Sequence, residues 1–433
     1  MNWDKLLNFQ RVGGSGNETF IPSRSPFNVD YDRIIFSSAF RRLDEKTQVH
    51  PLRHNDNVHS RLSHSLEVSS VGRSLGTLAG GFLQYQKQLP EHFTPDHTGQ
   101  IIQTACLAHD IGNPPFGHAG EDIISSWFLA RPQYLKALEQ EQKNDFLHFE
   151  GNAQAFRLLT RLGMYKDNGG LRPTYAMAAS LMKYPWIFHS GSNKYCSFDG
   201  EKELLKEIAE GTGLVGDKNI YCRHPFAFLS EAADDICYSI IDIEDAFELG
   251  MISFAEASEI LNGICRLSAE RTEGKSEKEQ IAFFRAVSIG KCIDAVIAKF
   301  IEKYDGIMSG ELSYKFNLLE NSSVSEQIQA AKKIGRDKIY VNPRKIMIEA
   351  GAENILDVLL TNYCNAALEI TAGGAKASYR SIGLMRSMGD GAVTAHDSIY
   401  TALHKVLDHI SGMTDKFAAE TAAMLYGIAN PLR

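Results

Sequence analysis

The chain has 433 residues, of which 44% are hydrophobic and 23% are charged, and this composition is typical of a globular protein with a large core. Its net charge of −8 argues against duplex DNA as the main partner, because proteins of that class are usually basic. No apolar run approaches the roughly 18–20 residues that span a bilayer, and Met1 to Leu7 does not resemble a secretory signal. The cysteines are scattered and include no Cys-x-x-Cys pair, so we expect a cytoplasmic protein without a membrane partner.

The hydrophobic spacing predicts a chain of helices. Residues 1–28 are rich in Gly, Ser, Asn and Pro and are expected to form an irregular arm, and the polar stretch 48–57 predicts a loop or small hairpin. His64, Val68, Val71, Leu75 and Leu78 predict a helix that buries His64 and ends at Gly80-Gly81. The expected helices cover 31–43, 59–79, 98–110, 121–130, 152–162, 230–250, 254–272, 278–303, 343–362, 395–409 and 414–427. Because few stretches alternate with period two, we predict an all-α fold with at most a few short strands.

The run from Leu107 to Glu121 carries the strongest chemical signal. His109 and Asp110 stand side by side at the end of the predicted helix 98–110, where Gly112 and Pro114-Pro115 stop it. Neutral imidazole and carboxylate are the ligands of a catalytic divalent metal. His118 and Glu121 follow at i, i+3, as expected of a general acid–base pair beside such a metal. The run therefore predicts metal-assisted hydrolysis.

Two other predicted helices bring similar side chains to a buried face. A lone histidine such as His64 on an apolar stripe is more often structural than a ligand. Asp234, Tyr238 and Asp242 lie at i, i+4 and i+8, so they share one face, and burying carboxylates there is costly unless they bind something. Three helices that each contribute a ligand-type side chain favour a shared site. A basic cluster, which is either a solvated face or an anion pocket, comprises Arg41, Arg42, Lys46, Arg53 and Arg61.

The ordered strings resemble a known family. The order of His64, His109-Asp110 and Asp234 is similar to that of the HD superfamily of metal-dependent phosphohydrolases. Further strings resemble the bacterial deoxyguanosinetriphosphate triphosphohydrolases over most of the chain. These strings are Phe40 to Leu43, Lys46 to Val49, Arg61 to Val68, His109 to Glu121, Phe149 to Ala153, Glu231 to Asp245 and Gly412 to Asp415.

The resemblance implies a role for each matched residue. One divalent metal per subunit, Mn²⁺ or Mg²⁺ in preference to Fe, Ni or Zn, would be held by His64, His109, Asp110 and Asp234. Asp234 is preferred over Asp235 because relatives keep Ala-Asp-x-Ile-x-Tyr. His118 and Glu121 would be the acid–base pair. The implied substrate contacts are Arg61, Lys183 and Tyr184 for the triphosphate, Gln48 and Asp242 for the sugar 3′-hydroxyl, Tyr238 under the deoxyribose, and Asn152 in the cavity wall.

The implied reaction converts a dNTP, with dGTP named by the family, and water into a deoxynucleoside and inorganic triphosphate. Alternatives are another HD-type nucleotide phosphodiesterase or exonuclease, or a regulatory protein that binds single-stranded nucleic acid through a vestigial site. Glu121 as a helix cap, Lys183 as a surface residue and Tyr238 as core packing are the structural alternatives. We expect a single unit over 1–433, with a metal-site core at about 59–250 and a helical region at 251–433 packed on it. Relatives form homo-oligomers, from dimers to hexamers, and some bind single-stranded DNA.

Overall fold

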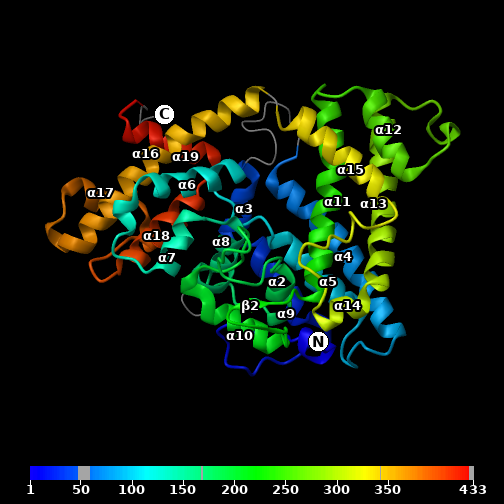
Figure 1. The fold of residues 1–433 in the computed structure, drawn as a ribbon, viewed down its shortest axis with the longest axis horizontal. Helices are drawn as coiled ribbons and strands as arrows, with labels where there is room; N and C mark the ends of the chain where they lie inside the picture. Colours follow the sequence, from blue (N-terminus) through cyan, green and yellow to red (C-terminus); the bar gives the residue numbers. More distant parts are fainter. Residues whose placement is uncertain (47–58, 167–168, 342, 429–433) are drawn as a thin grey trace.

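The computed structural model describes residues 1–46, 59–166, 169–341 and 343–428, and the regular secondary structure of this part of the chain is almost entirely helical (Figure 1). The strands β1 (Gly216–Asp217) and β2 (Ile220–Tyr221) form one short antiparallel pair. The all-α prediction is therefore confirmed. None of the described helices combines the length and apolarity needed to span a bilayer.

The helices fall into two groups along the chain. The first group comprises α1 (Trp3–Leu6), α2 (Pro26–Ile35), α3 (Ser38–Arg42), α4 (Arg61–Tyr85), α5 (Pro95–Ala108), α6 (His118–Ala130), α7 (Gln140–Leu147), α8 (Gly151–Arg157), α9 (Tyr175–Leu181), α10 (Lys202–Thr212) and α11 (Pro225–Glu248). The second comprises α12 (Phe254–Cys265), α13 (Glu277–Glu302), α14 (Tyr304–Ser309), α15 (Ser325–Ile334), α16 (Pro343–Gly373), α17 (Tyr379–Ser387), α18 (Ile399–Ser411) and α19 (Asp415–Leu425). A π-helical turn, η4 (Leu158–Leu162), continues α8.

Two large hydrophobic cores hold these helices together. One core joins α4, α5 and α11 to α12, α13 and α15, which lie on the right of Figure 1. The other joins α6 and α7 to α16, α18 and α19, on the left of the same view. The helices that follow residue 250 are thus divided between the two cores. The expected division of the chain at residue 250 stays a prediction.

The helix predicted to end at Gly80-Gly81 in fact runs on to Tyr85, and that prediction was wrong. Gly76 and Gly80 lie where α4 meets α5. A Cβ added at Gly76 would lie 2.6 Å from the Thr98 carbonyl oxygen, and one at Gly80 would lie 2.7 Å from Pro95 Cα. These glycines therefore allow two helix backbones to approach closely and do not end the helix. Leu78, predicted on the buried stripe, is 44% exposed.

We expect Gly76→Ala to destabilise the protein by about 1–3 kcal/mol, because the added methyl group must push α4 and α5 apart. Gly81→Ala is the matched control, since a Cβ at Gly81 meets nothing within 4 Å. In a helix this control should be neutral or stabilising by up to about 1 kcal/mol. Urea unfolding of both variants measures the difference. Equal midpoints for the two variants would show that the α4–α5 contact does not require glycine.

The N-terminal arm also differs from its prediction as irregular. Trp3 and Leu6 on α1 are buried in the first core, and Trp3 Nε1 donates to the Tyr304 hydroxyl at 2.6 Å. The helix predicted over 31–43 is two helices, α2 and α3, because Ser37 interrupts the pattern and caps the second. The hairpin predicted at 48–57 lies outside the described residues.

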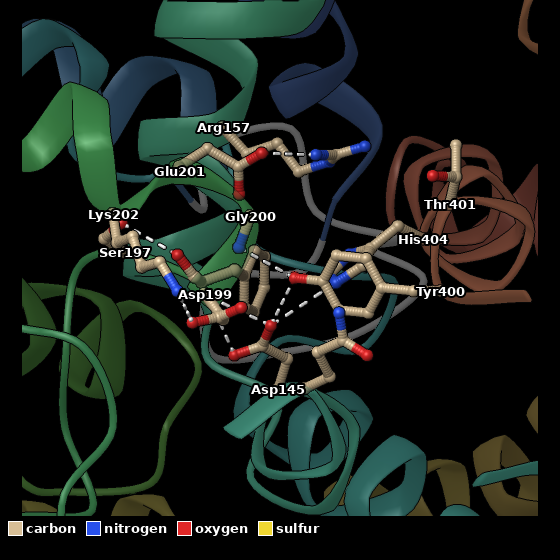
Figure 2. Close-up of polar contacts among 12 residues, drawn as sticks. Asp145, Arg157, Ser197, Asp199, Gly200, Glu201, Lys202, Tyr400, Thr401 and His404 are labelled. Carbon is tan, nitrogen blue, oxygen red and sulfur yellow. Dashed lines mark hydrogen bonds and ion pairs between the residues drawn. The ribbon is translucent and has the colours of Figure 1, made fainter. Parts of the chain in front are cut away.

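A buried polar cluster ties α18 to α7, α8 and the turn before α10 (Figure 2). Arg157 on α8 donates to Glu201 Oε1 at 2.5 Å and to Asp408 Oδ1 at 2.9 Å. The Tyr400 hydroxyl donates to Asp145 Oδ2 at 2.6 Å, and burial raises the pKa of Asp145 well above its usual range. Because Arg157, Glu201 and Asp145 are buried, these pairs hold α18 against α7 and α8, and the first turn of α8 borders the site described below.

Candidate active site

The segment that follows α5 forms the floor of the site. His109 caps α5, and Asn113 Nδ2 donates to Asp110 Oδ1 at 2.6 Å within the turn that follows. Gly112 packs directly on α8, because a Cβ there would lie 2.2 Å from both the Ala155 nitrogen and the Gly151 oxygen. Only glycine permits this approach, so the turn after His109 is held against the N-terminus of α8.

The C-terminal region supports the same segment from behind. Asp415, at the start of α19, accepts a hydrogen bond from the Phe116 amide at 2.9 Å. Lys46 Nζ donates to the backbone carbonyl oxygen of Asn113 at 2.6 Å and to that of Ser411 at 2.7 Å. Burial lowers the pKa of Lys46 to about 7. The string Gly412 to Asp415 therefore has a structural role, because its Asp415 anchors the segment that follows His109 and Asp110.

Two imidazoles and a carboxylate from three helices meet in the cavity. His64 on α4 and His109 after α5 each point a ring nitrogen at Asp234 on α11. The Asp234 Oδ1 atom lies 3.2 Å from His64 Nε2 and 3.5 Å from His109 Nε2. Among the described residues, these three form the group whose ligand atoms all lie within 4.8 Å of one another.

The arrangement fits a divalent metal. Bonds of about 2.1 Å to nitrogen and oxygen place neighbouring ligand atoms about 3 Å apart, close to the distances observed here. His109 Nδ1 lies 2.7 Å from the Cys106 carbonyl oxygen, and donation to that oxygen leaves Nε2 free of its proton and facing the site. Metal-binding histidines are commonly oriented in this way.

Asp110 lies beside this group and is held by two donors. Its Oδ1 accepts from Asn113 Nδ2 at 2.6 Å, and its Oδ2 accepts from Arg61 Nη1 at 2.6 Å. Its Oδ1 also lies 3.5 Å from His109 Nε2. Burial alone would raise the pKa of Asp110, but His109 and Arg61 outweigh burial and hold it well below the usual range. Asp110 is therefore a carboxylate at neutral pH, at the edge of the three-residue group.

The two neighbouring aspartates on α11, Asp234 and Asp235, have different partners. Lys183 Nζ donates to Asp234 Oδ2 at 2.7 Å. Burial would raise the pKa of Asp234, but Lys183 and the two imidazoles together hold it well below its usual range. Asp235 instead accepts from Asn317 and lies 3.4 Å from Lys332 Nζ. The two carboxylates thus have different partners, and the one that faces the imidazoles is Asp234.

His118 and Glu121 on α6 line the same cavity. Burial raises the pKa of Glu121 to about 7, with a further rise from Glu150, although Lys194 and the Gly151 amide oppose it. The pKa of His118 is lowered, first by burial and then by the positive charges of Lys194 and Arg61. Near pH 7 the histidine is therefore neutral, and the carboxyl group is partly protonated.

The cavity has a volume of about 410 Å³. Its walls include all the predicted metal ligands, both acid–base residues, Arg61, Asn152, Lys183 and Tyr238. Tyr184 and Asp242 are not among the lining residues. Asp242 lies behind Tyr340, whose hydroxyl donates to its Oδ2 at 2.5 Å, and Gln48 falls outside the described residues.

Other lining residues were not predicted from the sequence. Tyr340 stacks on Tyr238 with ring centroids 5.8 Å apart, and Lys345 forms an ion pair with Glu349 on α16. These residues come from a stretch with no matched string, and only the structure brings them to the cavity. Glu150 lies two positions before Asn152 in a matched string, so the sequence could have indicated that it lies near the site.

Comparison with known proteins places the chain in a family. The family model described as HD domain matches residues 61–162. A deoxyguanosinetriphosphate triphosphohydrolase-like protein of Pseudomonas aeruginosa (strain LESB58) is 39% identical over 100% of both chains. One from Synechocystis sp. is 38% identical over 99% of this chain and 100% of the relative. A deoxyguanosinetriphosphate triphosphohydrolase of Yersinia enterocolitica is 31% identical over 78% of this chain and 76% of the relative.

The chain belongs to the deoxyguanosinetriphosphate triphosphohydrolase family. Family membership confirms the resemblance found in the sequence strings, and the matched HD domain implies a divalent metal. His64, His109 and Asp110 lie within the HD match, whereas Asp234 lies beyond it on α11. The individual roles of the lining residues stay predictions.

Proposed function

We propose that this protein hydrolyses a deoxynucleoside triphosphate, with dGTP the expected substrate, to a deoxynucleoside and inorganic triphosphate. One observation carries the proposal. One cavity holds the His64–His109–Asp234 group together with the side chains of His118, Glu121, Arg61 and Lys183. The volume of this cavity suits a single nucleotide. The family membership of the chain supports the same reaction class.

The divalent metal, Arg61 and Lys183 would offset the negative charge of the triphosphate. A divalent ion, Mn²⁺ or Mg²⁺, held by His64, His109, Asp110 and Asp234 would neutralise phosphate charge and activate water. Arg61 and Lys183 present positive charge at the cavity of a chain whose net charge is −8. They would hold the triphosphate in line with the attacking water, which is the main source of rate in phosphoryl transfer.

The acid–base roles follow from the two opposite pKa shifts. Glu121 retains a proton near neutral pH and would donate it to the departing 5′-oxygen. His118 is neutral in the same range and would accept a proton from the attacking water. Two titratable groups pushed apart in this manner are the usual sign of an acid and a base in one site.

Tyr238 would exclude ribonucleotides. Its ring is backed by Tyr340, so a sugar 2′-hydroxyl pressed against it would find neither space nor a partner. We expect Tyr238→Ala to reduce the dGTP-to-GTP ratio of kcat/KM by roughly 10- to 100-fold, which corresponds to about 1–3 kcal/mol. Tyr238→Phe keeps the ring and should retain the preference. Unchanged rejection of GTP by Tyr238→Ala would remove the sugar role.

Product analysis tests the proposed reaction directly. Purified protein is incubated with each of the four dNTPs and Mn²⁺, and the products are separated by anion-exchange chromatography. Deoxynucleoside and inorganic triphosphate support the proposal. A deoxynucleoside monophosphate with pyrophosphate contradicts it, and shortening of a single-stranded oligonucleotide without dNTP hydrolysis favours the HD-type exonuclease alternative.

A further inference from the structure

Two buried acids beside His118 share one lysine. Lys194 Nζ lies 2.8 Å from Glu150 Oε2 and 3.5 Å from Glu121 Oε2. Glu121 is 6% exposed and Glu150 is 3% exposed, whereas the side chain of Lys194 is 42% exposed. One partly exposed cation thus faces two carboxyl groups that water barely reaches. This trio belongs neither to the metal group nor to the predicted substrate contacts.

The other contacts of the two acids are neutral. Glu121 Oε1 accepts from the Gly151 amide at 3.0 Å, and Glu150 Oε1 accepts from Asn152 Nδ2 at 2.6 Å. Tyr195, whose phenol donates to the His148 oxygen, lies near both acids and stays neutral because burial raises its pKa. Among the described residues, the charged groups near this region include Arg61 on α4 and Asp110 after α5, both beyond the neutral His118, and the Lys345–Glu349 pair across the cavity on α16.

The count of charges around the trio decides its protonation. If both acids ionised, two negative charges would face one partly solvated ammonium group, and like charges at a buried site disfavour joint ionisation. The negative charge of Glu150 therefore makes it harder for buried Glu121 to lose its proton. The backbone at Gly151 packs closely against Glu121, since a Cβ there would lie 2.5 Å from Glu121 Oε1. The Glu121 carboxyl group therefore has no room to move toward Gly151 and away from Glu150.

We propose that Glu150 is a positioning residue that keeps one proton on Glu121, and that Lys194 determines how tightly this proton is held. This inference rests on the proposed function. During hydrolysis the water oxygen bonds to the α-phosphorus, and the bond from phosphorus to the 5′-oxygen breaks. That 5′-oxygen keeps the electron pair and takes the proton of Glu121. The proton lost by the water, accepted first by His118, returns to the carboxyl pair, so the cycle closes without another reactant.

Because the Lys194 side chain is partly exposed beside the two acids, an incoming triphosphate would compete with them for its positive charge. When Lys194 turns toward phosphate, Glu121 loses this nearby positive charge and holds its proton more firmly. The arrival of substrate thus readies the acid that its leaving group needs. Lys194 acts on the reaction through Glu121 as well as through substrate affinity.

Two variants should shift the alkaline limb of the kcat–pH profile in opposite directions. Glu150→Gln removes a negative charge and leaves Lys194 to Glu121 alone, so Glu121 loses its proton more easily and the limb moves about one pH unit lower. Glu150→Asp keeps the charge and should restore the parental limb. Lys194→Gln removes the positive charge, so the limb moves higher by a similar amount while KM rises. Lys194→Arg should restore the limb.

An infrared titration without nucleotide gives a readout that does not need activity. The carbonyl stretch of the protonated carboxyl group, assigned by subtracting Glu121→Gln spectra, should lose intensity near pH 7 in the parent, at lower pH in Glu150→Gln and at higher pH in Lys194→Gln. Opposite shifts support the pairing even if dNTPs prove not to be the substrates. Shifts in the same direction, or none in either spectra or kinetics, overturn it while leaving the proposed reaction intact.

Discussion

Asp234→Asn is expected to abolish binding of the divalent ion and to lower dNTP hydrolysis by at least about a thousandfold. Asp234 Oδ1 is the atom that both imidazoles approach, and its Oδ2 holds Lys183. Replacing one oxygen by an amide nitrogen removes the negative charge, turns an acceptor into a donor and leaves Lys183 without its ion-pair partner. The measurement is the metal content of dialysed protein together with single-turnover rates in Mn²⁺.

Asp294→Asn is the control for the charge change, because Asp294 lies exposed on α13, away from the cavity. It should leave metal content and rate as in the parent. Circular dichroism must show that both variants fold. If folded Asp234→Asn retained one ion per chain and turnover within tenfold of the parent, the metal centre would have to be sought elsewhere.

Local sequence patterns account for the parts of the fold that could be predicted, whereas tertiary packing accounts for much of what could not. The segment from Thr98 onward was predicted well because its apolar period and its stop at Gly112 agree with each other. The end of α4 was predicted wrongly because, when this helix is considered alone, Gly80 has the pattern of a C-terminal stop. Its meaning depends on α5, which is packed against it. The break at Phe36 and Ser37 has instead a local cause, because Ser37 caps α3 and so overrides the apolar period of the predicted helix.

The candidate site divides in the same way. His64 lies on the buried face of α4, His109 directly follows the apolar helix α5, and Asp234 lies on the amphipathic helix α11, so the helical pattern made each a candidate. The order of the matched strings then predicted that the three belong to one site. Lys194 lies on an irregular segment, where no period indicates the direction of a side chain. Its meeting with Glu121 depends on how that segment packs over α6.

Tyr340 joins the cavity for an equally long-range reason, since it follows η7 (Gly335–Ile339) and comes to lie over Tyr238 on α11. Asp242 shows the converse. The helical spacing placed it correctly on the face shared with Asp234 and Tyr238, but only the structure shows that the Tyr340 hydroxyl separates it from the cavity.

His118→Ala should keep the metal and lose most of the turnover, by roughly a hundredfold to ten-thousandfold. His118 lines the cavity but is not one of the three residues whose ligand atoms converge, so its removal leaves ion binding unchanged. The substitution takes away the neutral imidazole that would accept the proton of the attacking water. The loss should appear in kcat, with KM within a few-fold of the parent, because His118 carries no charge to offer the triphosphate.

Added imidazole provides a sharper version of the same test. The side chain lost in His118→Ala leaves space in the cavity for a free base, so imidazole should restore part of the rate with saturation and with a dependence on its neutral form. His92→Ala, which alters an exposed histidine between α4 and α5, should match the parent and gain nothing from imidazole. Turnover of His118→Ala within a few-fold of the parent would transfer the base role to another group in the cavity. A loss of bound metal would instead make His118 a ligand, and the proton route drawn from the opposite pKa shifts of His118 and Glu121 would have to be abandoned.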